Sequence, residues 1–337
     1  NSGFVLIQVL LFSLFINAQE NTDNLRLYDK FEPLVSENLF KTEGYYNWGT
    51  SIIKGKDGKY HMFYSRWKKE YGFYGWLTHS EIAHATSKTP SGPWKYKETA
   101  LEGAGKNKWD AITAHNPKIK YFEGKYYLYY ISTNLGDKAY FEEDLIETAK
   151  TGYSHSNWKI LRPNQRTGVA VSNSINGPWQ RMEQPLIEPS GPITTLTVNP
   201  AIDKGKDGKY YLVIKGDKPN EKRFIRNQVV AISETPSGPF KIQEKPVIDY
   251  IDTEDMSMWY DETRKRFYGV FHTHGFIGMV TSEDGINWKK SNEYVLMRKE
   301  VRMKDGSVLI PDRLERPFIY HENGTPKVLS LAVKKDN

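Results

Sequence analysis

KDGKYYLVI, at residues 206–214, joins an Asp-Gly turn to a run of aromatic and aliphatic residues. The same motif occurs as KDGKYHMFY at residues 56–64 and as EGKYYLYY at residues 123–130, with weaker copies at residues 261–271 and 322–333. An Asp-Gly or Asn-Gly pair between two apolar runs is a strong signal for a β-hairpin. The sequence therefore predicts one hairpin that is repeated along most of the chain.

A second motif follows the hairpins at a variable distance. It reads SKTPSGPW at residues 87–94, SINGPW at 174–179, SETPSGPF at 233–240 and SEDGINW at 282–288. Each copy ends a short strand and begins another, so that the repeat has four antiparallel strands in about 60 residues, the size of a propeller blade.

The first strands of the repeats begin near residues 48, 115, 198, 255 and 315. The predicted fold is therefore all-β, a single five-bladed β-propeller of four-stranded antiparallel blades over residues 19–337. The fifth repeat stops after its second strand, so either the segment around residues 25–34 completes that blade or the C-terminus is clipped. No helical period of useful length is visible.

The amino-acid composition excludes several classes of site and ligand. Among 337 residues there is no Cys, which excludes disulfides, cysteine metal sites and a thiol nucleophile. The net charge of +6 comes from scattered basic residues, which argues against nucleic acid and favours an acidic small partner. Aromatic residues make up 14%, and exposed Trp and Tyr suit sugar rings. No phosphate loop or dinucleotide motif is present, so no organic cofactor is expected, while a structural divalent metal remains possible.

The N-terminal residues 1–18 carry no charge and contain an apolar run at residues 4–16 that ends in Ile-Asn-Ala. This pattern predicts a secretory signal peptide cleaved after Ala18. A membrane anchor is the weaker reading, because it needs about 20 apolar residues. We therefore expect an exported protein, periplasmic or secreted, that has no membrane partner after cleavage and whose oligomeric state is open.

The ends of the inner strands of a propeller meet at the axis, where a ligand pocket usually opens. Polar residues at equivalent points of every repeat are hard to explain as core filling, because unpaired burial is costly. The candidate site comprises Trp48, Arg66, Trp67, His79, His115, Asn116, Arg166, Asn199, Lys215, Arg226, Glu254, His272, His274, Glu315 and Arg316.

Each candidate also has a structural interpretation. Trp48 and Trp67 suit sugar stacking and packing between blades equally well. Arg66, Lys215 and Arg226 are either anion ligands or solvated surface charges. His272-x-His274 has metal-ligand spacing on a strand, but two hydrogen-bonding histidines are the favoured interpretation, and no metal ligand is assigned.

The five-blade pattern, with Asn-Pro at residues 116–117 and 199–200 and the Gly-Lys-Tyr-Tyr-Leu hairpins, resembles the propellers of glycoside hydrolase families 43 and 117. The resemblance implies an Asp base at the start of the first blade, a second Asp and a Glu acid. Here the first blade starts with Asn47-Trp48-Gly49, so the Asp base is missing. Only Glu254 or Asp255, and Glu315, are left as axial carboxylates, and Glu254 and Glu315 could supply the pair that a hydrolase would need.

Histidines and cations outnumber the carboxylates, and they suit elimination from an acidic sugar. Arg or Lys can neutralise a uronate while the proton at C5 is removed, and His can act as base or acid. The expected roles are His115 as base or acid, His272 or His274 as its partner, and Arg66, Lys215, Arg226 and Arg316 as anion ligands.

Among family-43-like propellers, the chain is similar to the ulvan-oligosaccharide dehydratases of marine bacteria. That resemblance implies removal of water across C4–C5 of a uronic acid at the non-reducing end of an anionic oligosaccharide. An exo-glycoside hydrolase on algal or plant oligosaccharides is the alternative, and a non-catalytic sugar-binding propeller is the second alternative.

Overall fold

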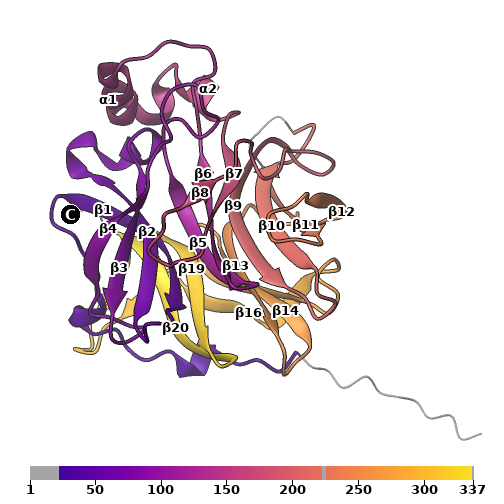
Figure 1. The fold of residues 1–337 in the computed structure, drawn as a ribbon. Coiled ribbons are helices and arrows are strands. Elements are labelled where there is room, and N and C mark those ends of the chain that lie inside the picture. Colours follow the sequence, from indigo (N-terminus) through magenta and orange to yellow (C-terminus); the bar gives the residue numbers. More distant parts are fainter. Residues whose placement is uncertain (1–22, 222–224, 336–337) are drawn as a thin grey trace, which may run out of the picture.

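The computed structural model describes residues 23–221 and 225–335. Antiparallel sheets are arranged around a common axis, with their first strands innermost (Figure 1). Inner strands of neighbouring sheets contact each other around this axis. The fold is thus an all-β propeller, as the repeats predicted. The predicted signal peptide, residues 1–18, lies outside the described residues.

Four sheets have four strands each, in the order of the sequence from the axis outward. Blade one contains β1 (Tyr45–Lys54), β2 (Tyr60–Lys68), β3 (Glu81–Ser87) and β4 (Lys95–Leu101). Blade two contains β5 (His115–Phe122), β6 (Lys125–Ser132), β7 (Arg166–Ser172) and β8 (Gln180–Arg181). Blade three contains β9 (Thr194–Lys204), β10 (Tyr210–Asp217), β11 (Arg226–Ser233) and β12 (Lys241–Ile248). Blade four contains β13 (Glu254–Asp261), β14 (Arg266–His272), β15 (Phe276–Ser282) and β16 (Lys289–Arg298).

The prediction of five four-stranded blades is wrong, because four are found among the described residues. The fifth repeat forms only the hairpin of β19 (Arg313–Glu322) and β20 (Thr325–Lys334). In the ring, β19 contacts both β1 and β13, so this two-stranded sheet lies between blades one and four. The short strands β17 (Val301–Arg302) and β18 (Val308–Leu309) form a separate sheet.

The described N-terminal segment adds no strand to the β19–β20 sheet. It contains the 3-10 turns η1 (Tyr28–Lys30) and η2 (Ser36–Asn38) and one isolated bridge between Leu34 and Met303. Leu25 and Leu27 are instead buried in the core of the fourth blade and its neighbours, and Leu27 N donates to Glu293 on β16. Side-chain burial along the fourth blade therefore takes the place of the predicted strand pairing.

Every inner strand contains a bulge close to its start. The residues at the five bulges have left-handed backbones: Gly49, Asn116, Asn199, Asp255 and Arg316, with φ between +53° and +61°. Gly, Asn and Asp adopt this conformation most readily, which explains four of the five. A bulge redirects a side chain away from the regular alternation, and these five surround the axis.

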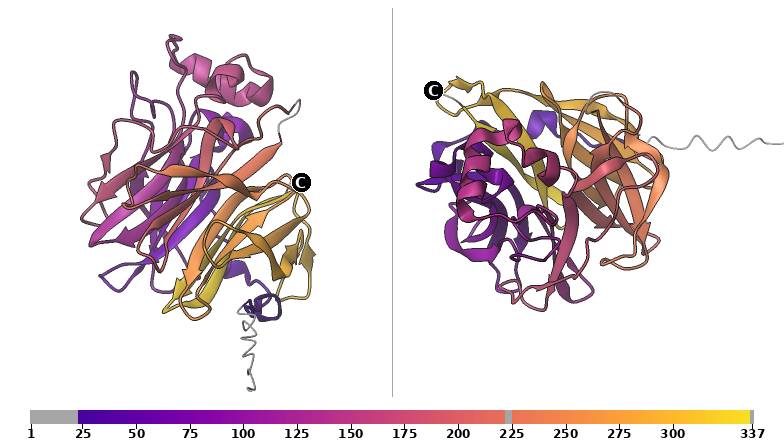
Figure 2. Two further views of the ribbon diagram at one scale, coloured as in Figure 1. Left: turned by 90° about the vertical axis from the view of Figure 1, so that its right-hand side faces the viewer. Right: turned by 90° about the horizontal axis from the view of Figure 1, so that it is seen from above.

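One helical insertion, which the repeats did not predict, lies between β6 and β7. It comprises α1 (Glu142–Thr151), η5 (Gly152–Ser154) and α2 (Trp158–Leu161). Three acidic residues in the first turn of α1 favour its N-terminus, and Phe141 N donates to Asp144 at 2.7 Å. The insertion packs on η3 (Lys69–Tyr71) and η4 (Phe73–Leu77), which follow β2, so it lies at the end of the ring where the inner strands begin (Figures 1 and 2). No helix of the described residues is long and apolar enough to span a membrane.

Candidate active site

Side chains from the bulges form a hydrogen-bonded chain around the axis. The side-chain amides of Asn116 and Asn199 contact each other at 2.7 Å, and Asn199 Nδ2 donates to Asp255 Oδ1 at 2.5 Å. Arg316 donates to the same oxygen of Asp255. Four repeats are thereby joined, and these residues line an axial pocket together with Gly49 and Lys118.

An aspartate–histidine dyad lies beside this chain. Asp255 Oδ2 is 2.8 Å from His272 Nδ1, at the end of β14, and both side chains are buried. Burial opposes the charged form of Asp255, but Arg316 and His272 outweigh it and hold the pKa of Asp255 below its ordinary value. The contact is an ion pair by distance, because the two atoms do not meet hydrogen-bond geometry. A carboxylate beside one ring nitrogen leaves the other nitrogen for chemistry. The sequence had singled out His272, but not Asp255 as its partner.

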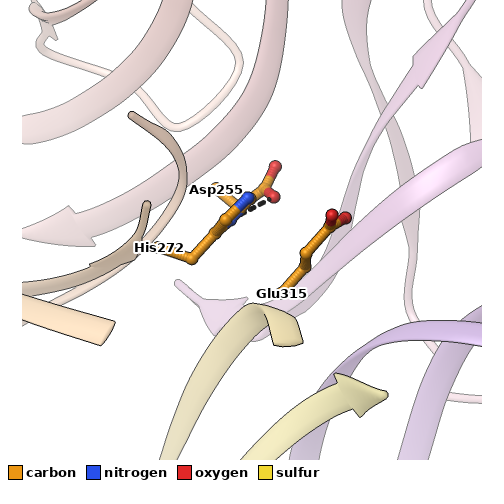
Figure 3. Close-up of side chains that lie close together, drawn as sticks. All are labelled: Asp255, His272 and Glu315. Atoms are coloured by element: carbon orange, nitrogen blue, oxygen red, sulfur yellow. Dashed lines mark ion pairs between the residues drawn. The ribbon is translucent and has the colours of Figure 1, made fainter. Parts of the chain in front are cut away.

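Glu315, at the start of β19, points toward the dyad (Figure 3). One ligand-type atom each of Asp255, His272 and Glu315 lies within 4.8 Å of the others. The donor types suit a divalent metal, but the surrounding charges do not. His272 already contacts Asp255 at hydrogen-bond length, and Arg316 contacts the same carboxylate. A divalent ion there would face the Arg316 guanidinium, so these residues fit a metal poorly.

His115 lies at the same end of the ring, beside two indoles. Its ring is 5.4 Å from that of Trp76 and 5.8 Å from that of Trp67, and Nδ1 is 2.6 Å from Ser80 Oγ. Burial, aided by the charge of Arg316, lowers the pKa of His115 well below its ordinary value, so the imidazole is neutral at pH 7. It is 2% exposed, which leaves little of it accessible from the pocket.

Glu254, the first residue of β13, lies in a cluster of charges at the end of the ring where the inner strands begin, which we call the rim. Lys215 on β10 contacts one of its carboxylate oxygens and Arg226 on β11 contacts the other. Arg226 also forms a two-pronged pair with Asp252, in which Nε is 2.7 Å from Oδ1. The structure thus brings three of the predicted residues together: Lys215, Arg226 and Glu254.

Four other predicted residues do not line the axial pocket, and three of them are held by other partners. Arg66 pairs with Glu81 at 2.5 Å and lies between the rings of two tyrosines inside blade one. Arg166 is held by Glu188 and by three backbone carbonyls. His79 stacks on Tyr71 at 3.8 Å and contacts Glu142 of α1. His274 is exposed in the turn between β14 and β15, so it does not share a strand face with His272.

Both predicted tryptophans are packing residues. Trp67 is 1% exposed, and its indole donates to Gly72 O at 3.2 Å. Trp48 is buried beside Trp67 and makes an edge contact with Phe73. Neither offers a free face to a sugar. Of the two interpretations that the sequence left open, sugar stacking and packing, their burial favours packing.

Four residues of the site were missed. Lys118 lines the axial pocket 5.3 Å from the Phe318 ring, and burial lowers its pKa to about 7. Arg313 donates to Glu315 at 3.0 Å. Trp76 covers His115, and the ring of Tyr153, from the insertion, lies 6.5 Å from that of Trp76. Lys118 could have been found from its position two residues after Asn116; Tyr153 had no sequence signal.

The sequence matches no protein-family profile and no curated protein. Solved structures do match. Zg3597, a family 117 glycoside hydrolase of the marine bacterium Zobellia galactanivorans, is 18% identical, with a TM-score of 0.61 over 88% of this chain and 82% of that chain. A thermostable family-43 glycoside hydrolase is 15% identical, with a TM-score of 0.54 over 82% and 80% of the two chains. A third, the GH43 beta-xylosidase/alpha-arabinofuranosidase CoXyl43 from a compost microbial metagenome, is 17% identical, with a TM-score of 0.50 over 87% of each. At these identities the likeness establishes the shared propeller fold.

Proposed function

We propose that the chain is a carbohydrate-active enzyme that removes water across C4–C5 of a uronic acid at the non-reducing end of an anionic oligosaccharide. The observation that carries this proposal is the Asp255–His272 dyad at the propeller axis, close to Glu315 and beside Arg316. The carbohydrate-active enzymes among the similar structures support action on carbohydrate. Ulvan fragments are one class of substrate with the required uronic acid.

In the proposed reaction, His272, paired with Asp255, takes the proton from C5 as the base. The C5–H electrons form the C4=C5 double bond, and the C4–O bond breaks. The leaving hydroxyl takes up the proton that His272 has removed from C5 and departs as water, because His115 is buried and neutral and Glu315 is ion-paired with Arg313. The substrate carboxylate must be neutralised for C5 to lose its proton.

A donor for that carboxylate remains at the rim. Arg316 Nε is buried and makes no hydrogen bond within the described chain. The Arg313 side chain is 40% exposed and uses one nitrogen for Glu315. The Arg313 guanidinium could therefore bind a uronate without breaking its existing pair, whereas the buried Nε of Arg316 is not open to a ligand.

The alternative is an exo-glycoside hydrolase, and the comparisons favour it over elimination, because similar structures are described as glycoside hydrolases. Glu254 and Glu315 would be its carboxylate pair. Each of them, however, is ion-paired with a cation, as is Asp255. None has the apolar surroundings that keep a proton-donating carboxyl neutral, and this is why we place elimination first.

The decisive experiment incubates the purified protein with oligosaccharides that end in glucuronic or iduronic acid. Ultraviolet absorbance reports a conjugated C4–C5 double bond, and mass spectrometry reports the products. New absorbance with loss of one water and no shortening is the expected result. Shortening with absorbance would indicate a lyase instead, and shortening without absorbance would overturn elimination and support the hydrolase. Binding without any reaction would support the sugar-binding propeller.

Two further proposals concern the metal requirement and the export of the protein. We propose that no metal is required, because Arg316 already balances the charge of Asp255; activity should survive dialysis against EDTA. We also propose export through the signal peptide of residues 1–18, which predicts a mature N-terminus at Gln19 when the secreted protein is sequenced.

A further inference from the structure

The helical insertion places an aromatic side chain close to Trp76, at the end of the ring where the inner strands begin. Tyr153, in η5, lies 4.9 Å from the ring of Tyr74 and 4.8 Å from that of Trp158. Its ring is also 6.5 Å from Trp76, and Trp76 stacks on His115. A continuous series of rings thus runs from the buried imidazole to Tyr153 at the surface.

The position of Tyr153 is fixed by close contacts of the insertion. Gly152 has φ +64°, and a Cβ there would lie 2.6 Å from the Tyr74 ring, so only glycine permits this approach. Thr78 donates to the carbonyl of Leu145 at 3.0 Å, and Thr133 donates to that of Leu161 at 2.7 Å. Both ends of the insertion are therefore tied to the propeller.

Charged residues at this end of the ring influence the pKa of the Tyr153 hydroxyl: Arg313 and Arg316 lower it and Glu315 raises it. Burial raises the pKa of Tyr153, so the phenol keeps its proton and can donate it in a hydrogen bond. The residue is nevertheless 47% exposed, which leaves part of its ring open to a ligand. A tyrosine with an apolar face and a protonated hydroxyl suits a sugar acid.

We propose that Tyr153 is the substrate-positioning residue of the pocket, with its ring against the terminal sugar and its hydroxyl donating to the sugar carboxylate beside Arg313. This inference rests on the proposed function for the acidic nature of the ligand. It adds that the insertion, rather than a blade, determines the preference for an acidic over a neutral terminal sugar.

The test measures binding separately from turnover. An oligosaccharide that ends in glucuronic acid and its glucose-terminated counterpart are titrated calorimetrically into the protein carrying His272→Gln, which is expected to bind without reacting. Tyr153→Phe should weaken binding of the acidic probe about tenfold, since a hydrogen bond to a charged group is lost, and should change binding of the neutral probe much less. Tyr153→Ala should weaken binding of both. Phe141→Ala, a 72% exposed aromatic at the start of the same insertion, is the matched control and should stay within twofold.

The ratio of the two dissociation constants separates positioning from a structural role, because a merely loosened insertion would weaken both probes alike. Thermal unfolding of Tyr153→Phe at the temperature of the parent protein would show that the fold is kept. Unchanged affinity for the acidic probe in both Tyr153 variants would overturn the inference. Failure of the parent protein to bind the acidic probe would overturn both the inference and the proposed substrate. Tyr153-dependent binding without new ultraviolet absorbance would overturn elimination alone.

Discussion

At the level of single residues, burial distinguishes two histidines that are two positions apart. His272 is buried against Asp255, whereas His274 lies exposed in a turn. His272→Gln should lower kcat by about 10²–10⁴-fold, the usual contribution of a general base, with little change in substrate affinity. The same change at His274 should leave kcat within twofold. Steady-state kinetics of both variants checks this, and equal losses would contradict the assignment of the dyad.

A buried histidine outside the site should make the free energy of unfolding depend on pH. His84 is fully buried in blade one, 2.8 Å from His61 and 3.1 Å from Glu98. Burial lowers the pKa of His84 to about 4, and Glu98 offsets this only in part. Between pH 6.5 and pH 4 the unfolded chain therefore binds a proton that the folded protein excludes, so stability falls on acidification. The loss from His84 alone is about 3 kcal/mol. Urea unfolding at both pH values should show it, and a much smaller loss is expected in His84→Gln.

At the level of secondary-structure elements, the bulge in each inner strand places one residue at the axial pocket. Asn199 of β9 has φ +57° and bonds to both Asn116 and Asp255. Asn199→Ala should cost about 2–4 kcal/mol, the sum of backbone strain and lost hydrogen bonds, whereas Asn199→Gly should spare the strain term of about 1–2 kcal/mol. Chemical denaturation of the pair measures the difference. Equal stabilities would show that the left-handed backbone is not what the position requires.

At the scale of the whole molecule, local signals predicted the blades and long-range contacts decided the site. The hairpin motifs located the inner strands because turn chemistry and alternation are local. They also located the end of the fifth repeat after its second strand, but they did not reveal that the segment around residues 25–34 leaves that sheet two-stranded. Arg66 and Arg166 were placed in the pocket by analogy between repeats, although their strands direct them to Glu81 and Glu188. Tyr153 comes from a single insertion with no second copy to compare.

One side chain, Arg316, links the two-stranded sheet to the blades on both sides of it and so closes the ring. Arg316 belongs to the two-stranded sheet, donates to Asp255 of blade four and lies against Gly49 of blade one. Arg316→Met should therefore destabilise the protein by about 3–5 kcal/mol, because it leaves the buried Asp255 carboxylate without its main cation. Asp255→Asn in the same protein removes that charge and should recover a large part of the loss, so the two substitutions should be strongly non-additive. A double-mutant cycle by urea unfolding measures the coupling, and simple additivity would mean that the β19–β20 sheet is held in the ring by apolar packing alone.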